Sequence, residues 1–168
     1  MNDPPELVHR STGDTLNGEI DKLTRSIHEM AGEEFNIKST QQLGTILFDK
    51  LGLPAGKKTK KGYSTSAEVL DKLKDKHPII NEILEYRSLT KLKSTYVDGM
   101  IPLIADDGKI HAHFNQTVTT TGRISCTEPN LQNIPVRQEL GRKLRCAFVP
   151  DNDNCTLVGA DYSQIELE

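Results

Sequence analysis

The stretch Ile79-Ile-Asn-Glu-Ile-Leu-Glu-Tyr-Arg-Ser-Leu-Thr-Lys-Leu-Lys-Ser-Thr-Tyr96 decides the fold of the first half of the chain. Its apolar residues recur every three or four positions, which is the spacing of a helix with one buried face. These residues are Ile79, Ile83, Tyr86, Leu89, Leu92 and Tyr96. His77-Pro78 interrupts the preceding pattern, and Asp98-Gly99 supplies a turn after it. We therefore predict one long helix between Pro78 and Asp98.

Shorter helical patterns precede this one. From Glu19 an apolar stripe, made of Ile20, Leu23, Ile27 and Met30, runs to a stop at Gly32. Capping boxes, in which a Ser or Thr is followed by Glu or Gln three residues on, predict the starts of two more helices. They are Ser39 with Gln42, whose helix ends at Gly52, and Thr65 with Glu68. Residues 1–18 show no clear period and are predicted to be loop or disorder.

The pattern changes after Pro102. Residues 109–116 alternate, with Ile110, Ala112 and Phe114 on one side and His111, His113 and Asn115 on the other. Residues 144–149 and 156–160 are further strand candidates. A helical first half followed by a β-rich second half predicts an α+β chain.

The composition describes a polar protein without a membrane segment. No apolar run approaches the ~20 residues that a membrane span needs, and no signal peptide opens the 168 residues. The three cysteines, Cys126, Cys146 and Cys155, are odd in number and far apart. That pattern predicts reduced thiols in an intracellular, cytoplasmic protein.

The net charge of −3 is unevenly distributed along the chain. Residues 1–56 carry five Lys/Arg against nine Asp/Glu, residues 57–145 carry sixteen against ten, and residues 146–168 carry none against five. A basic middle followed by an acidic end suits a protein that binds a polyanion and then places metal ions. An uneven but merely solvated surface is the alternative explanation.

Two basic or polar segments could bind nucleic acid. Lys57, Lys58, Lys60 and Lys61, followed by Ser64 and Thr65, form a basic tip beside a predicted helix start, where phosphates can bind. Gly122-Arg123 allows close backbone approach beside a guanidinium, and the amides of Asn130, Gln132 and Asn133 can contact minor-groove acceptors. Solvated loops are the alternative for both segments.

Metal ligands are the other candidate chemistry. Asp161 follows the apolar run 156–160, and a carboxylate at the end of a strand can hold a divalent cation. It could also precede a helix capped by Ser163 and Glu166, and the two interpretations are compatible. His111 and His113 could be ligands two residues apart, although the polar face of a strand explains them more simply.

Read together, the segments closely resemble family A DNA polymerases, from Phe35 to Leu167. The resemblance rests on the order and spacing of several motifs: Phe35–Gly44, Gly62–Ser66, Leu84–Arg87, Lys91–Tyr96, Phe114–Arg123, Pro129–Arg137 and Asp161–Leu167. It implies that residues 19–100 are the helical thumb and residues 101–168 the N-terminal part of the palm. The implied fold is a helical thumb followed by the first strands of an antiparallel palm sheet.

The same resemblance implies roles for individual residues. Asp161 is similar to the first catalytic, metal-binding aspartate, with the backbone carbonyl of Tyr162 as a further ligand, and Glu166 to the residue that excludes ribonucleotides. The implied DNA contacts are Lys57, Lys58, Lys60, Lys61, Ser64, Thr65, Lys93, Arg123, Asn130, Gln132, Arg137 and Gln164. The implied partners are a primer-template duplex and, in the complete enzyme, deoxynucleoside triphosphates and two Mg²⁺ ions.

Several parts of the family's active site have no counterpart in these residues. They are the triphosphate-binding helix of the fingers, the second metal-binding aspartate and the remaining palm. We therefore expect the isolated chain to be inactive although its family catalyses template-directed addition of deoxynucleotides to a primer 3′-hydroxyl. The alternative is a non-catalytic, sequence-independent DNA-binding module or a truncated gene remnant.

Overall fold

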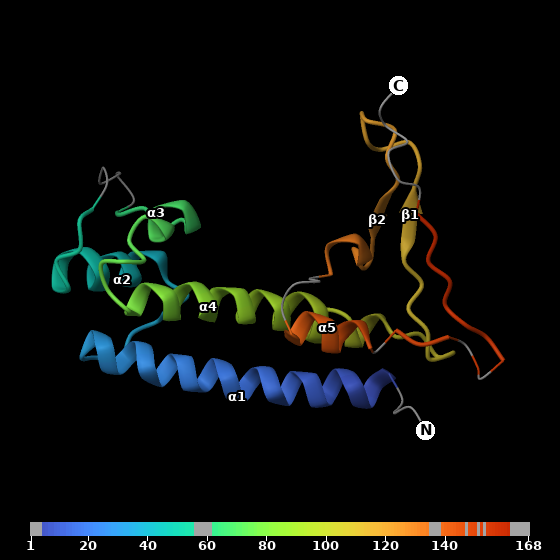
Figure 1. The fold of residues 1–168 in the computed structure, drawn as a ribbon, viewed down its shortest axis with the longest axis horizontal. Coiled ribbons are helices and arrows are strands. Elements are labelled where there is room, and N and C mark those ends of the chain that lie inside the picture. The colour runs from blue at the N-terminus through green and yellow to red at the C-terminus, as the bar shows by residue number, and fades with distance from the viewer. Residues whose placement is uncertain are drawn as a thin grey trace.

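The computed structural model describes residues 5–55, 62–134, 139–146, 148–150, 152 and 154–161. Two long helices form its base: α1 (Pro5–Ala31) and α4 (Ile79–Leu92), which lie side by side (Figure 1). Two smaller helices, α2 (Thr40–Gly44) and α3 (Ala67–Asp71), lie at one end of this pair, and α5 (Glu139–Arg145) packs on α1 nearer the other end. A short hairpin rises at the other end, so that the molecule has raised ends and a hollow between them.

The helical end follows the sequence pattern closely. Helix α2 (Thr40–Gly44) continues as a wider π-helical segment, η1 (Thr45–Lys50), and α3 (Ala67–Asp71) follows the basic tip. Helix α4 continues in the same way into η2 (Lys93–Asp98), which confirms the predicted helix between Pro78 and Asp98. The predicted stops at Gly32 and Gly52 are also confirmed, since both adopt the left-handed backbone conformation (φ of 73° and 65°).

One predicted cap is wrong by a residue. Ser39 caps α2 as expected, its hydroxyl accepting from the Gln42 backbone N–H at 3.4 Å. Helix α3, however, is capped by Ser66 rather than Thr65, since the Ser66 hydroxyl accepts from the Val69 N–H at 3.4 Å. Thr65 is used elsewhere, because its hydroxyl and its carbonyl both accept hydrogen bonds from Arg87.

Residues 5–18 are helical, so the prediction of loop or disorder there is wrong. Leu16 is fully buried, and Gly13 packs so closely that a Cβ on it would lie 3.0 Å from a methyl group of Val97. The partners of this part of α1 come from η2 and α5 (Glu139–Arg145), far along the chain. Tertiary contacts therefore extend the helix beyond its own apolar stripe.

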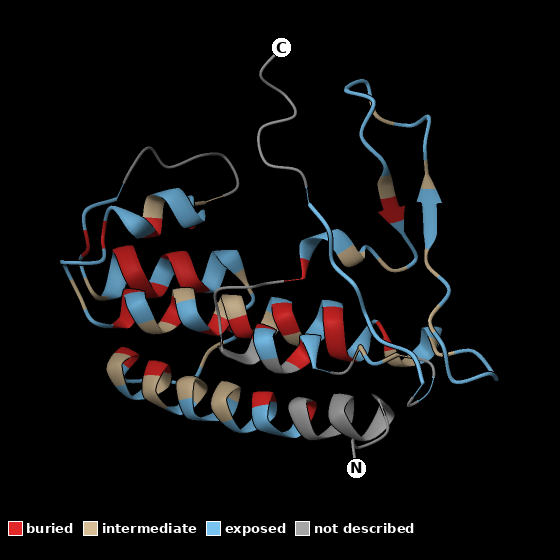
Figure 2. Ribbon diagram, turned by 45° about the vertical axis from the view of Figure 1, so that its right-hand side comes forward, coloured by how far each residue is buried: buried red, intermediate tan, exposed pale blue. Residues whose placement is uncertain are grey.

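Two apolar cores lie along the base, visible as the buried residues of Figure 2. The larger core fills the helical end, between α1, α2, η1, α3 and the start of α4. Its buried members are Ile27, Ala31, Ile37, Leu43, Ile46, Leu47, Phe48, Leu53, Leu70, Leu73, Ile79, Ile80, Ile83 and Tyr86. The smaller core joins α1 and the end of α4 to later segments. It contains Leu16, Leu89, Leu92, Tyr96, Val97, Met100, Ile134 and Leu144.

The second half holds less β-structure than the α+β prediction requires. A short helical turn, η3 (Ile101–Leu103), leads to an antiparallel pair of three-residue strands, β1 (His113–Asn115) and β2 (Ser125–Thr127), with Phe114 opposite Cys126. A second turn, η4 (Leu131–Asn133), follows. Over its described residues the chain is therefore mostly helical with a small two-stranded antiparallel sheet.

The other predicted strands are not formed within the described residues. Residues up to Arg145 belong to α5, because Leu144 (1% exposed) packs into the smaller core from a helix. Residues 154–161 have no regular structure, and Leu157 and Val158 are 67% and 84% exposed. Phe114, on the apolar side of the predicted 109–116 strand, is 64% exposed. An apolar run forms a buried strand only where a neighbouring strand satisfies its backbone, and the described residues offer none beside 154–161.

Candidate nucleic-acid interface

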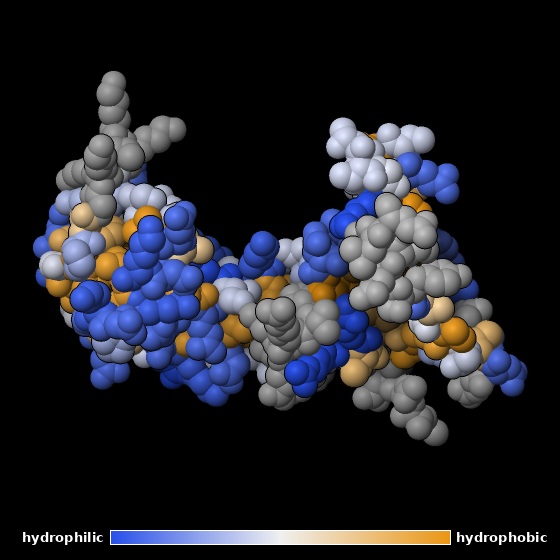
Figure 3. Space-filling view, turned by 45° about the horizontal axis from the view of Figure 1, so that its top comes forward, coloured by the Kyte–Doolittle hydropathy of each residue, from blue (hydrophilic) through white to orange (hydrophobic). Residues whose placement is uncertain are grey.

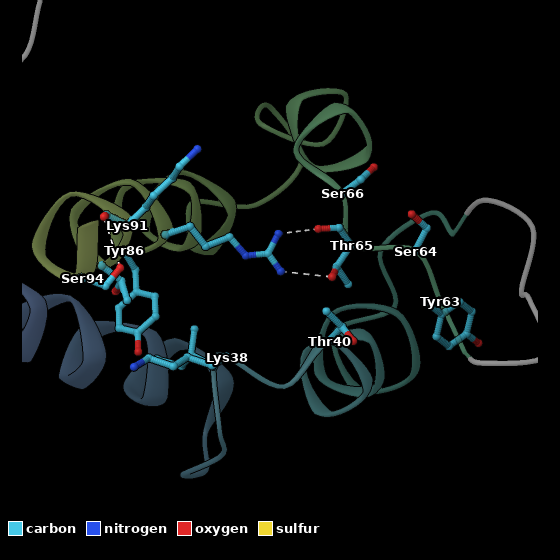
Figure 4. A pocket seen from close by; sticks show the side chains of 12 residues that line it. Lys38, Thr40, Tyr63, Ser64, Thr65, Ser66, Tyr86, Lys91 and Ser94 are labelled. Atoms are coloured by element: carbon cyan, nitrogen blue, oxygen red, sulfur yellow. Dashed lines mark hydrogen bonds between the residues drawn. The ribbon is translucent and has the colours of Figure 1, made fainter. Parts of the chain in front are cut away.

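A broad cleft of the described residues lies at the helical end, beside α4. It has a volume of about 790 Å³. Three segments form its walls: residues 37–40 at the entry to α2, residues 63–66 before α3, and the face of α4 and η2 from Tyr86 to Ser94 (Figure 4).

The lining of this cleft is cationic and rich in hydroxyl groups. Among the described residues it contains three cations and six Ser or Thr side chains, with Ile37 and two tyrosines, and no carboxylate. The cations are Lys38, Arg87 and Lys91, and the hydroxyl residues are Thr40, Ser64, Thr65, Ser66, Thr90 and Ser94. Ammonium, guanidinium and hydroxyl groups are the side chains that bind phosphate and sugar oxygens.

The two lysines of the cleft are exposed and make no ion pair with described residues. Other lysines of this part of the chain are neutralised locally: Lys22 lies 2.9 Å from Glu19, Lys50 3.0 Å from Glu33, and Lys74 2.7 Å from Asp71. An ammonium group without a neighbouring carboxylate keeps its full attraction for an anion. Lys38 and Lys91 therefore contribute positive charge to the cleft that no carboxylate among the described residues pairs with.

Hydrogen bonds fix the 63–66 wall. The Tyr63 hydroxyl donates to the Asp49 carboxylate at 2.7 Å, and its ring packs on Phe48 with 4.8 Å between centroids. Arg87 reaches from α4 to Thr65, and burial lowers the pKa of its guanidinium. The Thr90 hydroxyl, also in the lining, is buried and has no hydrogen-bond partner within the described residues.

Only part of the predicted basic tip can be placed. Ser64 and Thr65 both line the cleft, although Thr65 is 5% exposed and Ser64 is exposed. Lys57, Lys58, Lys60 and Lys61 lie outside the described residues, as do Arg137, Tyr162, Gln164 and Glu166. Lys93 does not line the cleft; its ammonium group binds the Asp98 carboxylate at 2.7 and 2.8 Å.

Three more predicted DNA contacts lie around the hairpin, at the other end of the molecule (Figure 1). Arg123 is exposed after Gly122, which has the left-handed φ of 74° expected of a tight turn. Asn130 caps η4, its side-chain oxygen accepting from the Gln132 N–H at 3.0 Å. The Gln132 amide donates to the Ile124 carbonyl at 2.9 Å. Both amides are exposed, and both also shape their own loop.

The described residues do not form a metal site. No three His, Cys, Asp or Glu side chains among them are close enough to hold an ion. Asp161 is exposed at the end of the described 154–161 segment. His111 and His113 face separate carboxylates, Asp107 at 2.9 Å and Glu128 at 3.7 Å. Backbone and side-chain hydrogen bonds, led by the Lys109 N–H, lower the pKa of Asp107.

Sequence reasoning missed most of the residues that make this cleft. On α4 and η2 the missed ones are Arg87, Thr90, Lys91 and Ser94, and at the entry to α2 they are Lys38 and Thr40. The signal in the sequence is a polar stripe at the same three-to-four-residue spacing as the apolar stripe of this helix. The predicted contact Lys93 lies off that polar stripe.

Known proteins share both the sequence and the fold of this chain. The family described as "DNA polymerase family A" matches residues 7–168, and the chain belongs to that family. DNA polymerase I of Bacillus subtilis is 56% identical over 156 residues, which are 92% of this chain and 18% of that protein. DNA polymerase I of Lactococcus lactis subsp. cremoris is 61% identical over 145 residues, 86% of this chain and 16% of that protein.

A solved structure is similar as well. It is described as the POL domain of Pol1 from M. smegmatis in complex with DNA primer-template and dNTP. The TM-score is 0.77 and the identity 43%, over 86% of this chain and 26% of that one. The chain spans less than a fifth of the length of the two curated relatives. No helix within the described residues is both long and apolar enough to cross a membrane.

Proposed function

We propose that this chain is a duplex-binding segment of a family A DNA polymerase and that the cleft beside α4 holds the sugar-phosphate backbone. The observation that carries the proposal is the lining itself: two exposed lysines and several hydroxyls, with no carboxylate among its described residues. Such a lining attracts any nucleic-acid backbone and reads no base sequence. The similar POL domain, solved in complex with primer-template DNA, supports the choice of duplex DNA.

In this proposal the helical end is the thumb, over residues 19–100, and residues 101–168 begin the palm. The exposed hairpin residues Arg123, Asn130 and Gln132 would contact the duplex at the opposite end of α4, across the hollow seen in Figure 3. The smaller core contains residues from both sides of residue 100. Packing therefore couples the two proposed parts.

The catalytic roles belong to the proposal for the longer protein. Asp161 and the Tyr162 carbonyl would bind Mg²⁺, Glu166 would exclude ribonucleotides, and Arg137, Gln164 and Lys93 would contact DNA or incoming phosphate. Mg²⁺ would supply charge stabilisation at the reacting phosphate. The described residues alone assemble no metal site.

Salt-dependent binding tests the proposed interface. The 168-residue chain should bind duplexes of unrelated sequence with similar Kd, and Lys38→Gln or Lys91→Gln should each weaken binding about fivefold to tenfold near 0.1 M salt. Each should also reduce the slope of log Kd against log salt by about 0.9, because one fewer counterion is released.

The matched control is Lys22→Gln on α1, whose ammonium group already pairs with Glu19. It should leave both the affinity and the slope unchanged. Equal effects of all three substitutions would refute a specific role for the cleft, because the net charge of the chain alone would then explain the change in DNA binding.

A non-catalytic DNA-binding module is the second candidate, and binding cannot separate it from a polymerase segment. Primer extension can. We expect none from the isolated chain with Mg²⁺ and all four deoxynucleotides, and extension only when the remaining palm and fingers are supplied. Extension by the isolated chain would contradict this expectation, and failure of the completed protein would favour the module.

A further inference from the structure

Arg87 makes a two-pronged contact across the cleft. From the middle of α4 its guanidinium donates one hydrogen bond to the Thr65 backbone carbonyl and a second to the Thr65 hydroxyl, the latter at 3.1 Å. Dashed lines in Figure 4 mark both bonds. Thr65 is the only buried polar residue among those whose burial is described. The rigid planar fork of arginine suits this paired geometry, whereas a lysine offers a single point charge.

The contact occupies both partners. The Thr65 hydroxyl, on a residue that is 5% exposed, is not available to a ligand in the cleft. Arg87 is partly buried, and two of its five N–H donors are directed at Thr65. By contrast, Lys91 lies one helical turn further along α4 and is exposed. Of the two cations on this wall, Lys91 can therefore extend toward a ligand in the cleft, whereas Arg87 is held against Thr65.

What the contact fixes is the pair of serines on either side of Thr65. Ser64 and Ser66 are exposed and line the cleft. Ser66 also begins α3, where its hydroxyl accepts from Val69. A second anchor lies at Tyr63, which bonds to Asp49.

The two anchors have different origins. Tyr63 ties the segment to η1, within the same group of small helices. Arg87 ties it to α4, which forms the opposite wall of the cleft. The bond to Thr65 therefore determines how far apart the α4 wall and the serine wall stand.

We infer that Arg87 is a positioning residue, which acts on DNA binding through Thr65 by holding Ser64 and Ser66 at the cleft, and that it does not itself neutralise a phosphate. This inference rests on the proposed function of the cleft. The two α4 cations then have separate roles: Lys91 pairs with a phosphate of the ligand, and Arg87 fixes the position of the 63–66 segment.

Binding of the full 168-residue chain to duplex DNA over a range of salt concentrations distinguishes the two roles. Arg87→Gln and Thr65→Val should each weaken binding about fivefold to tenfold. This is the effect expected when the hydrogen bonds that hold the 63–66 segment are lost, which costs about as much as one net hydrogen bond. Neither should change the slope of log Kd against log salt. Lys91→Gln should reduce that slope by about 0.9.

Two further variants and one combination sharpen the test. Arg87→Lys keeps the charge and should not restore binding, whereas Thr65→Ser keeps the hydroxyl and should bind almost like the wild type. The double variant Arg87→Gln with Thr65→Val should bind no more weakly than either single variant, because both remove the same contact. Thermal unfolding followed by circular dichroism sets a temperature at which every variant is folded.

The inference is overturned if Arg87→Gln lowers the salt slope as Lys91→Gln does, if Arg87→Lys restores binding, or if Thr65→Val has no effect. A wild-type chain that fails to bind duplex DNA would instead contradict the proposed function, so the two failures are distinguishable. The 63–66 segment offers an independent readout. Amide exchange at Ser64 and Ser66 should accelerate in Arg87→Gln and remain unchanged in Lys91→Gln.

Discussion

At the scale of single residues, Tyr96 joins the helical base to the segment that follows the hairpin. Its hydroxyl donates to the Asn133 backbone carbonyl, and the residue is 7% exposed within the smaller core. Burial raises the pKa of the Tyr96 phenol, because the charged phenolate is poorly solvated there. One side chain thus links residues 37 positions apart and makes that link sensitive to alkaline pH.

We predict that Tyr96→Phe lowers the free energy of unfolding by about 1 kcal/mol at neutral pH, because the Asn133 carbonyl loses its donor. The pKa of the phenol is higher in the folded chain than in the unfolded one. The wild type therefore keeps this stabilisation below about pH 10 and loses it as pH rises through the folded-state pKa. Urea unfolding of both proteins from neutral to strongly alkaline pH should show the two free energies converging, and parallel curves would contradict the assignment.

At the scale of elements, α1 contains one glycine that an alanine could replace and ends at another that it could not replace without strain. Gly18 lies in the helix and is exposed, and a Cβ added to it would meet no other atom within 4 Å. Gly32 ends the helix with a φ of 73°, which residues other than glycine adopt only with strain. The same substitution should therefore have opposite effects at the two positions.

We predict that Gly18→Ala raises the free energy of unfolding by about 0.5–1 kcal/mol, because alanine loses less backbone entropy in a helix. Gly32→Ala should lower it by about 1–2 kcal/mol. Each variant is the control for the other in urea unfolding. Destabilisation by Gly18→Ala would show that residues around 18 are not helical, in conflict with a helix from Pro5 to Ala31.

Periodicity predicted the helices well and the strands poorly, for a physical reason. The stripe from Ile79 to Tyr96 buries its face against α1, so the local pattern and the tertiary contacts agree. The residues of α1 before Glu19 and those of α5 are held by partners far along the chain, which no local window contains. The segments 144–149 and 156–160 carry apolar runs, but a strand needs a neighbour to bond its backbone.

The candidate site shows the same limit. The sequence pointed to Ser64 and Thr65, because basic and hydroxyl residues gather beside a helix start there. It did not indicate that Thr65 would be buried on Arg87 or that Lys38 would line the same cleft. Those facts depend on how α2, α3 and α4 pack, and only the polar stripe on α4 could be read from the sequence.

At the scale of the whole molecule, the cationic cleft and the exposed apolar side chains lie at different ends. The cationic cleft lies at the helical end, while exposed large apolar side chains concentrate around the hairpin and the 154–161 segment; they include Phe114, Val118, Ile124, Leu157 and Val158. Figure 3 shows hydrophilic residues over much of the helical end and a hollow before the hairpin. This arrangement supports the proposal that a bound duplex would lie on the face beside α4.

Lysine acylation with and without duplex DNA, read by mass spectrometry, tests that location most directly. Lys38 and Lys91 should become protected when the duplex is bound, since both are exposed and line the cleft. Lys22 on α1 and Lys72 after α3, whose side chains are 67% and 74% exposed, should react equally in both conditions. Protection of Lys38 and Lys91 with unchanged Lys22 and Lys72 is the predicted result. Unchanged labelling of Lys38 and Lys91 at saturating DNA would contradict it.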